Sequence, residues 1–534
     1  MQTTLLGLAL AVILALVAAL VGPLLIDWGT YRSAIDREAS RLVGLDVRVT
    51  GAIDARLLPS PRLVLHDIEI GRAGDDTLRA RSLGIEFALA PLMRGEWRAS
   101  DMALSGLDIK LGLDATGHVQ APNIALRFNA DALSIDRLSI TDSRITLTDA
   151  ASGANITLDS VSFNGEMRSL FGPFTGEGAV RADGALYPYR VSAGRIGDDG
   201  AVKLHVNIDP AARPFGIEAD GMLTLAGGTP QFDGTLGVSR PAGIAPQGGA
   251  LMQPWRIAGK LKVSAASALM EQIEFQYGSE DLGAKLTGTA EFKFGPHPHF
   301  DSVVSGRQID LDRGLAQSDA SPPSPVKAVR ALIDATGGAL PPSVPVQIGI
   351  GIDEVTLGGN TIQTLRGDIS SDTQGWSFDH FEFRAPGFTQ VNFSGRIAPD
   401  GGTPAFNGPA DVQSSDPLVF AAWLQGRPPP QPGDTRPLRL RGDMTLGTEK
   451  VAIERLNAEF DRKPVTGRFV YVFGAAGHRP LLDAELQAAD LDVDAALGVV
   501  NALVAGSDVE RPHDIALSLD IARATVAGMD ARDA

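Results

Sequence analysis

The chain has 534 residues, a net charge of −17 at neutral pH and no cysteine. A chain of this length is too long for one compact core, so several domains or a repeating array are expected. The negative charge argues against nucleic acid as a partner, and the lack of cysteine excludes disulfides, thiolate nucleophiles and cysteine-based metal centres. The 60 glycines, 34 prolines and 6% aromatic residues favour short strands joined by tight turns over a helical bundle.

The N-terminal region contains a segment long and apolar enough to cross a membrane. It begins at Leu5, ends at Ile26 and carries no charge over its 22 residues. A bilayer core of about 30 Å needs about 20 helical residues, so we predict a transmembrane anchor within residues 1–27. A cleaved signal peptide is the alternative, but its apolar region is usually shorter and follows a basic start that is missing here. Basic residues follow the segment and none precedes it, so charge alone favours the orientation opposite to export.

Residues 28–44 predict an amphipathic helix that links the anchor to the body. Apolar side chains recur there at nearly helical spacing: Trp28, Tyr31, Ile35 and Leu42. Gly44 is a plausible C-terminal stop, and tryptophan and tyrosine are typical of the membrane–water interface. We expect the two helices to be continuous or nearly so through Asp27 and Trp28, and the body to begin at Leu45.

From residue 45 onward, apolar and polar residues alternate in runs that end at Gly, Asp, Asn or Pro. This period of two predicts strands with one apolar and one polar face, and the lack of βαβ alternation favours an antiparallel meander. The apolar face is the candidate groove lining, exemplified by Leu63, Leu65, Ile68, Ile70, Leu138, Ile140, Ile145 and Leu147. The alternative for each is ordinary sandwich core, because alternation does not show which face encloses a cavity.

Three sets of strand-like sequences recur in the same order, about 170 to 220 residues apart. The matching ranges are 134–140 with 351–357 and 520–526, 286–295 with 465–474, and 309–315 with 491–497. In the second set, two glycines stand seven residues apart in both copies. Repetition of sheet units predicts an elongated array in which each unit buries its neighbour's edge.

These copies and the helical segments between them divide the chain. After the anchor and linking helix, we predict a first β-groove region at 45–315, a helix and linker at 316–344, a second repeat at 345–494, a helix at 495–511 and the start of an incomplete repeat at 512–534. The expected fold is mainly β: a transmembrane helix, then a repetitive antiparallel β-groove with a few short amphipathic helices. Because the last unit is begun but unfinished, either the chain is part of a longer protein or its open edge meets a partner.

No sequence pattern indicates catalysis. A nucleophile elbow, a P-loop, a dinucleotide-binding fingerprint and an HExxH motif are all missing from the sequence. His297 and His299 could share an ion if they stood in a strand, with Asp301 nearby, but the flanking prolines favour a surface turn. We therefore predict no enzyme activity, no catalytic residue, no metal site and no cofactor.

Two acidic pairs offer a second possible cation site. Asp310 and Asp312 form one pair, and Asp492 and Asp494 form the other, at matching positions of the sequence copies. Each pair stands where a strand is expected to become a helix. N-capping and the favourable effect of an anion near a helix N-terminus account for both pairs without a cation.

The N-terminal residues also carry a resemblance to a known family. The residues that carry it are Arg32, Gly44, the strand with Leu45, Val47 and Val49, then Gly51, Pro59, Pro61 and "LVLHDIEIG". This order resembles the N-terminal segment of the AsmA family, bacterial envelope proteins anchored in the inner membrane. The later "RLSITDSRITLTDAASG" and the "LTG…FG…DLD" units are similar to the family's body repeats. A basic residue before the anchor is missing, so the orientation rests on the resemblance.

The resemblance implies a single-pass protein of the bacterial inner membrane, with a periplasmic body folded as a repeating β-groove related to bridge-like lipid-transfer proteins. The expected function is to hold or conduct phospholipid acyl chains, in outer-membrane biogenesis or lipid homeostasis. The expected partners are membrane lipids, the inner membrane itself and an envelope protein at the distal end. The alternative is a regulator or chaperone of outer-membrane protein assembly that acts through exposed β-edges. An enzyme acting on envelope glycans or lipids has the least support.

Overall fold

The computed structural model describes residues 20–21, 26–43, 45–71, 78–94, 97–120, 133–167, 172–197, 199–210, 215–241, 243–244, 251–252, 254–278, 284–312, 324–328, 344–372, 375–400, 403–428, 436–447, 449–473, 479–496, 498, 514–526 and 528–532. The predicted mainly β fold is confirmed: a long, mostly antiparallel sheet with few short helices. Most of the predicted transmembrane segment lies outside the described residues. Among those that are described, no helix has the length and apolar character needed to span a bilayer.

The chain divides into two compact units. Unit 1 comprises Met1–Pro241, Ala258–Met270 and Lys293–His297, and unit 2 comprises Ala242–Ile257, Glu271–Phe292 and Pro298–Ala534. The boundaries predicted from the sequence copies, at residues 315 and 345, follow repetition rather than contacts. They therefore stay a prediction.

The helix that follows the predicted anchor begins anew at Trp28. Asp27 has an extended backbone, and its side chain accepts a hydrogen bond from the Gly29 N–H over 3.0 Å. This is an N-cap, so the predicted continuity through Asp27 and Trp28 is wrong. A short 3-10 turn, η1 (Trp28–Tyr31), leads directly into the helix α2 (Arg32–Val43).

Helix α2 is held against the first strand of unit 1. Asp36 Oδ1 accepts a hydrogen bond from the Val49 N–H over 3.0 Å, and Ser40 Oγ accepts one from the Val47 N–H over 2.8 Å. Both N–H groups belong to β1 (Val47–Val49), and both valine side chains are buried. The linking helix therefore packs on the start of the sheet.

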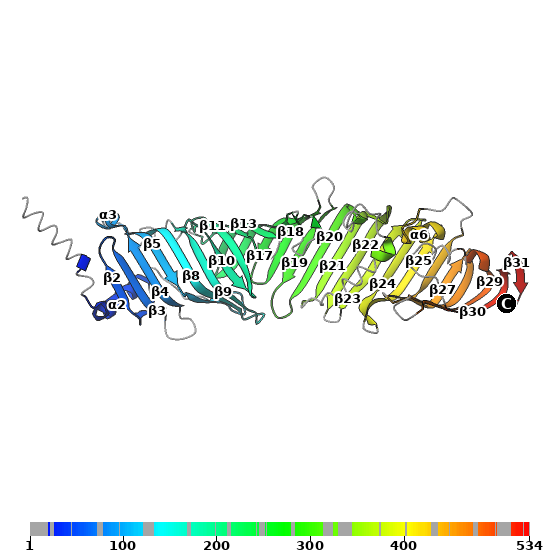
Figure 1. Cartoon of the computed structure of the whole chain (residues 1–534), viewed down its shortest axis with the longest axis horizontal. Helices are drawn as coiled ribbons and strands as arrows, with labels where there is room; N and C mark the ends of the chain where they lie inside the picture. The colour runs from blue at the N-terminus through cyan, green and yellow to red at the C-terminus, as the bar shows by residue number, and fades with distance from the viewer. Residues whose placement is uncertain are drawn as a thin grey trace, which may run out of the picture. The chain divides into compact units, whose positions relative to one another are not determined.

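The strands of unit 1 pair largely with their neighbours in chain order (Figure 1). They are β1, β2 (Ile53–Arg56), β3 (Arg62–Ile70), β4 (Leu78–Phe87), β5 (Trp97–Ser105), β6 (Asp108–Leu113), β7 (Val119–Gln120), β8 (Leu133–Asp149), β9 (Asn155–Met167), β10 (Phe174–Ala182), β11 (Ala185–Ala193), β12 (Val202–Ile208), β13 (Gly216–Ala226) and β14 (Thr229–Arg240). The helix α3 (Leu89–Leu92) follows β4. Strands β8 to β14 form an antiparallel meander, whereas β5 and β6 pair parallel with β8.

Unit 2 continues with strands of similar length. They are β19 (Ala284–Lys293, whose last residue belongs to unit 1), β20 (His299–Asp310), β21 (Val346–Leu357), β22 (Asn360–Asp372), β23 (Gly375–Ala385), β24 (Thr389–Asp400), β25 (Thr403–Ser414), β26 (Leu438–Gly447), β27 (Lys450–Phe460), β28 (Lys463–Val472), β29 (Leu481–Asp492), β30 (Asp514–Val526) and β31 (Met529–Arg532). A separate ladder joins β15 (Gly243–Ile244) and β16 (Leu251–Met252), and the helix α6 (Pro417–Leu424) follows β25. Strands β17 (Trp255–Val263) and β18 (Ser267–Tyr277) contribute residues to both units.

Three strands break the antiparallel order, and they contain the three copies of the first repeated sequence. β8 pairs parallel with β5, β21 with β20, and β30 with β29. A purely antiparallel meander is therefore wrong at these places, because a parallel pair needs a crossover connection instead of a hairpin. Each copy buries its second and fifth residues: Ile135 and Leu138, Ile352 and Val355, Ile521 and Ala524. The sequence repetition thus marks one structural step that occurs three times.

The glycine shared by the second repeated sequence marks a close approach of two strands. A Cβ atom on Gly288 of β19 would lie 2.1 Å from the carbonyl oxygen of Val303. At the matching position in β28, a Cβ atom on Gly467 would lie 1.9 Å from the carbonyl oxygen of Glu485. No side chain fits at either distance, so glycine lets the neighbouring backbone pass and the strand bend there.

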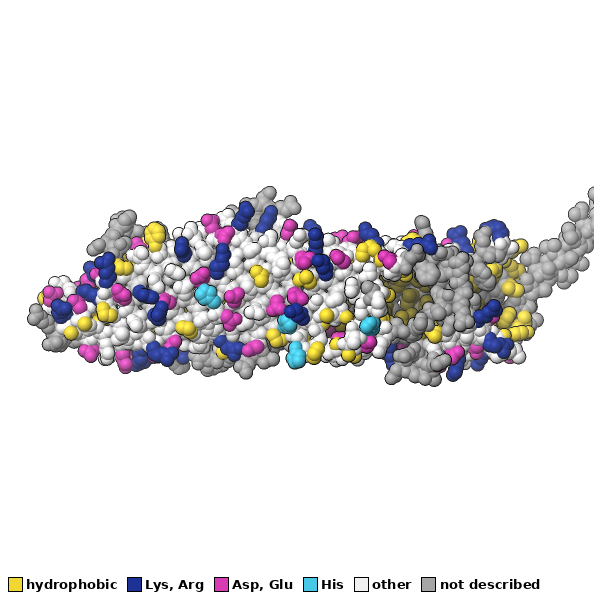
Figure 2. Space-filling view, turned by 180° about the vertical axis from the view of Figure 1, so that it is seen from behind, with side chains coloured by type: hydrophobic (Ala, Val, Ile, Leu, Met, Phe, Trp, Pro, Cys, Tyr) yellow, Lys and Arg dark blue, Asp and Glu magenta, His cyan; other side chains and the backbone are white. Residues whose placement is uncertain are grey.

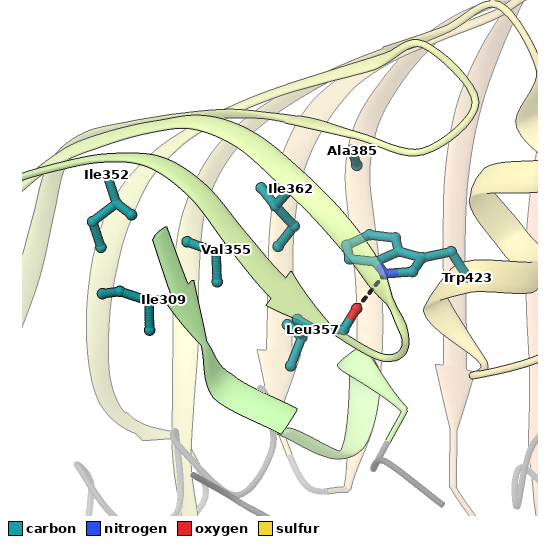
Figure 3. Close-up of a cluster of buried hydrophobic side chains, with 7 residues drawn as sticks. All are labelled: Ile309, Ile352, Val355, Leu357, Ile362, Ala385 and Trp423. Atoms are coloured by element: carbon teal, nitrogen blue, oxygen red, sulfur yellow. Dashed lines mark hydrogen bonds between the residues drawn. The ribbon is translucent and has the colours of Figure 1, made fainter. Parts of the chain in front are cut away.

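One buried cluster forms where a helix lies on the apolar side of the sheet. In unit 2, Trp423 of α6 joins Ile352, Val355 and Leu357 of β21 in this cluster (Figure 3). The indole Nε1–H of Trp423 donates a hydrogen bond to the Leu357 carbonyl over 2.8 Å. The helix is capped by Asp416 and has proline at its first position, and both residues favour a helix start.

Candidate functional site

Strand β3 places four of the candidate groove residues on one face. Leu65 and Ile68 are buried, and Leu63 and Ile70 pack against the same cluster. The numbering changes from odd to even between Leu65 and Ile68, which strict alternation would not allow. Asp67 adopts a left-handed backbone (φ 51°) and absorbs the extra residue, so both halves of the strand present their apolar side chains to the same side.

Strand β8 repeats this arrangement with the other four candidates. Leu138 is buried, Ile140 packs beside it, and Ile145 and Leu147 are half-buried farther along the strand. Asp142 has φ 49°, and the register with β9 shifts between Ile140 and Ser143. This bulge again keeps the apolar side chains before and after it on the same face of the strand, although their residue numbers change from even to odd. The sequence analysis selected these residues without a reason for the change, and the left-handed aspartate supplies it.

Not all of the apolar face is equally accessible. Against the four β3 residues, η1 and α2 take the place that a ligand would need, with Trp28 of η1 and Ile35 and Ala39 of α2 packed into the cluster. Ile140, by contrast, belongs to a cluster whose described members come from β4, β5, β8 and β9. A hollow of about 650 Å³ that Ile140 also borders is lined mainly by polar residues, among them Glu177, Arg190 and Asn207, so it lies toward the polar face of the sheet. The role of the eight candidates as groove lining stays a prediction.

Strands β11 to β14 carry a continuous part of the apolar face. One row of cross-strand partners runs through Tyr189, Ile208, Ile217 and Val238, and a second runs through Val191, Val206, Ala219 and Leu236. All eight side chains are half-buried, although a second layer of sheet or helix would bury such positions fully. Near the N-terminal part of the chain, the space-filling view shows hydrophobic side chains inside a recess (Figure 2).

The opposite face of these strands is polar. Arg190 of β11 lies 3.5 Å from Glu177 of β10, and Asp220 of β13 lies 3.4 Å from His205 and 3.8 Å from Lys203 of β12. Exposed ion pairs of this kind contribute little to stability. They identify the solvent side of the sheet and leave the apolar rows as the side on which a nonpolar ligand could bind.

Two of the residues considered for a metal site lie beside each other. His299 Nε2 lies 3.3 Å from the Asp301 carboxylate in β20. Within the described ranges, no three histidine or acidic side chains gather in a way that could hold a metal ion.

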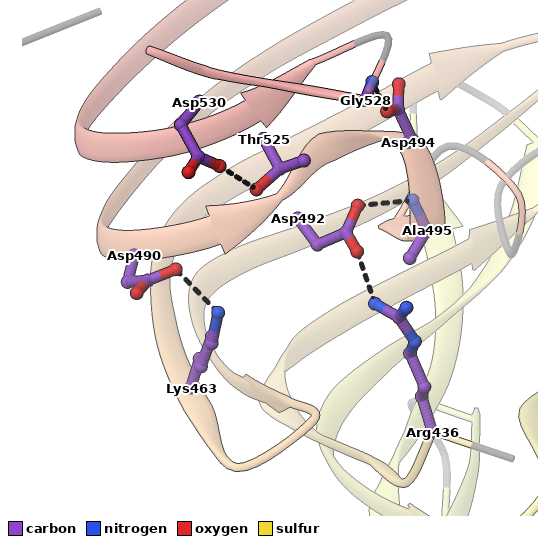
Figure 4. Close-up of polar contacts among 9 residues, drawn as sticks. All are labelled: Arg436, Lys463, Asp490, Asp492, Asp494, Ala495, Thr525, Gly528 and Asp530. Carbon is purple, nitrogen blue, oxygen red and sulfur yellow. Dashed lines mark hydrogen bonds and ion pairs between the residues drawn. The ribbon is translucent and has the colours of Figure 1, made fainter. Parts of the chain in front are cut away.

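The acidic pair Asp492 and Asp494 organises the end of a repeated strand (Figure 4). Asp492 Oδ1 accepts a hydrogen bond from the Ala495 N–H over 3.0 Å, which confirms the predicted N-cap. This bond, followed by the contact with Arg436, holds the pKa of Asp492 below its usual range. Asp494 accepts a hydrogen bond from the Gly528 N–H over 2.9 Å, a contact between distant segments that the sequence analysis missed.

Three comparisons with known proteins complete the description. A family model described as the AsmA family matches residues 2–195. Searches among curated proteins and among solved structures found no match. The matched region extends from the predicted anchor beyond the end of β11. The resemblance inferred from the sequence is therefore confirmed over residues 2–195, where the chain matches the model of the AsmA family.

Proposed function

We propose that the chain holds or conducts phospholipid acyl chains along the apolar face of its sheet. In this proposal it is a bacterial inner-membrane protein with a periplasmic body and contributes to outer-membrane biogenesis or lipid homeostasis. The observation that carries it is the pair of apolar rows across β11 to β14, whose side chains stay half-buried. The match of residues 2–195 to the AsmA family model supports the envelope setting.

The chemistry of the rows suits an acyl chain. Removing one CH₂ group from water contributes about 0.8 kcal/mol, so a chain laid along several strands would be held strongly. The rows offer aliphatic and aromatic contacts without a charged side chain among their eight members. A uniform apolar surface creates no single deep minimum, and a bound chain could therefore slide along it.

A pair of neighbouring substitutions tests the proposal. Val191 belongs to an apolar row, and the next residue, Ser192, is exposed on the opposite face. The full chain is exchanged out of detergent, and its lipid content is measured by native mass spectrometry. We expect phospholipid with the unaltered chain and with Ser192→Asp, and a strong loss with Val191→Asp, because a buried carboxylate opposes acyl contact. An unaltered chain without phospholipid, or equal lipid content in both variants, would count against the function.

The edge of β30 favours a second candidate, a regulator or chaperone of outer-membrane protein assembly. Ile515 is 62% exposed and Leu517 is 52% exposed in this strand. In the described residues, β30 pairs with β29 along most of its length, but with β31 only from Arg523 to Val526. An exposed strand edge can receive a strand from a client protein. Proline substitution at Leu517 would then abolish client crosslinking and leave lipid content unchanged.

A further inference from the structure

A short hairpin at residues 113–120 connects two rims of the sheet in unit 1. The ladders from β8 to β14 are antiparallel, so successive turns alternate between one rim and the other. Counted along this meander, the β8–β9 turn and the β13–β14 turn lie at opposite rims. Strand β6 ends beside the first of these turns, where Leu113 pairs with Asp149. A few residues later, the Val119 N–H donates a hydrogen bond to the Gly228 carbonyl in the second turn over 2.9 Å.

The hairpin makes two further contacts at the rim that it reaches. Gly117 is buried, and a Cβ atom there would lie 2.5 Å from the Cβ of Ala265, in the turn between β17 and β18. Its φ of +83° also favours glycine. The ring of His118 lies 3.4 Å from the position of a Cβ on Gly228. The hairpin therefore rests on the rim at close range, along three successive residues.

The tip of the hairpin is rigid by its own hydrogen bonds. Asp114 Oδ1 accepts hydrogen bonds from the N–H groups of Thr116 and His118, over 2.8 and 3.0 Å, and from the Thr116 hydroxyl over 2.6 Å. The Thr116 hydroxyl also lies 2.7 Å from His118 Nδ1. By contrast, in the part of the chain that the structure describes, the hairpin joins the opposite rim through the hydrogen bond from Val119 to Gly228 and the close approaches of Gly117 and His118. Few contacts at a rigid element favour its opening as a unit.

We propose that residues 113–120 form a strap that closes the mouth of the groove between β8 and β14. This inference rests on the proposed function and adds to it one step, at which the strap controls the passage of a lipid. A phospholipid whose acyl chains lie on the apolar rows must keep its polar headgroup at the open mouth, because burying the headgroup without partners is costly. A strap from rim to rim blocks that headgroup, so the strap must lift from Gly228 before the lipid passes.

The absence of cysteine from the sequence makes a direct test possible. The double variant His118→Cys/Gly228→Cys is designed to join the hairpin to the opposite rim by a disulfide, because the His118 ring lies 3.4 Å from the position of a Cβ on Gly228. The full chain is reconstituted in phosphatidylethanolamine–phosphatidylglycerol vesicles, and movement of a fluorescent phosphatidylethanolamine to acceptor vesicles is followed. We expect the disulfide to form, transfer to be lost in the oxidised form, and transfer to return after reduction. The single variant His118→Cys, given the same oxidant, should transfer at the unaltered rate.

Each contrary outcome has a distinct meaning. Failure of the disulfide to form, together with rapid exchange of the Val119 amide in the unaltered chain, would show that the strap does not lie against the opposite rim. Equal transfer by the oxidised and reduced forms would show that lipid does not pass beneath it, although the groove still carries lipid. No transfer by the unaltered chain would overturn the proposed function, and the strap proposal with it.

A second measurement does not depend on the folding of the cysteine variant. In the unaltered chain, the Val119 amide should exchange with deuterium more slowly than the neighbouring exposed amides. Asp114→Ala removes the internal hydrogen bonds of the tip and should abolish this protection, while the β13–β14 hydrogen bonds stay protected. Rapid exchange at Val119 in the unaltered chain would overturn the proposal.

Discussion

The carboxylate of Asp312 accepts a hydrogen bond from the backbone N–H of Gly358 over 2.7 Å, across 46 residues of sequence. Its other oxygen accepts one from Gly359, also over 2.7 Å. The matching aspartate of the later copy, Asp494, accepts a hydrogen bond from Gly528. In each copy, the second aspartate of the Asp-x-Asp sequence thus fastens the turn that follows the parallel strand.

Replacing this fastening residue should loosen the turn. Asp312→Ala leaves two backbone N–H groups without their charged acceptor, and hydrogen bonds to charged groups contribute about 1.5–3 kcal/mol each. We expect the amides of Gly358 and Gly359 to lose most of their protection in hydrogen exchange. Asp353→Ala is the matched control, because Asp353 makes an exposed ion pair with Arg366. Similar exchange in the two variants would contradict this role for Asp312.

Trp423 should stabilise unit 2 through both its ring and its Nε1–H. Trp423→Phe keeps most of the packing but removes the donor to the Leu357 carbonyl, and we expect a loss of about 1–3 kcal/mol in unfolding free energy. Trp423→Ala also leaves a cavity and should cost about 3–5 kcal/mol. Phe388, which is 90% exposed, provides the control, and Phe388→Ala should change stability by less than about 0.5 kcal/mol. Equal effects at the two positions in urea unfolding would show that α6 does not seal the cluster.

The shared glycine offers a steric test of strand bending. Gly288→Ala would bring a methyl group to 2.1 Å from the Val303 carbonyl oxygen, so we expect a loss of at least about 1–3 kcal/mol. Gly237→Ala is the control in another strand, since its nearest neighbour, the Glu218 carbonyl oxygen, is 3.9 Å away. The control should be neutral or slightly stabilising, because alanine has less backbone freedom to lose on folding. A neutral Gly288→Ala would rule out close strand approach at this glycine.

The acid sensitivity of unit 2 should depend on Asp492. The Ala495 N–H, and next the Arg436 guanidinium, lower the pKa of Asp492 in the folded chain. Its contribution to stability is therefore present above the unfolded pKa, about 3.9, and is lost as the pH falls through the lower folded value. Asp492→Asn should remove this part of the acid dependence, measured by urea unfolding between neutral pH and about pH 2. A variant with an unchanged pH profile would contradict the assignment.

Much of the fold could be predicted from the sequence because alternation directly reports strands with one buried face. The order of the repeated sequences also located the strands β8, β21 and β30, at which the same structural arrangement recurs. The parallel pairing of β8, β21 and β30 could not be predicted, since it depends on crossovers between distant segments rather than on local pattern.

The candidate site was predictable in kind but not in place. The β3 residues have the expected alternation, yet α2 covers them, and sequence periodicity does not show which part of a sheet a helix will cover. The accessible rows of β11 to β14 have the same pattern as the covered ones. The left-handed Asp67 and Asp142 were also missed. An aspartate at the point where the apolar positions of a strand change between odd and even residue numbers is a usable sign of a bulge.

Site-specific photocrosslinking tests the central claim most directly. A photoreactive phenylalanine analogue is placed at Val206, in an apolar row of β12, or at Thr235, on the exposed face of β14, and the intact cells are irradiated. The proposed function predicts phospholipid crosslinked to position 206 and little or none at position 235. Absence of lipid at both positions, or equal lipid at both, would contradict a groove that carries acyl chains.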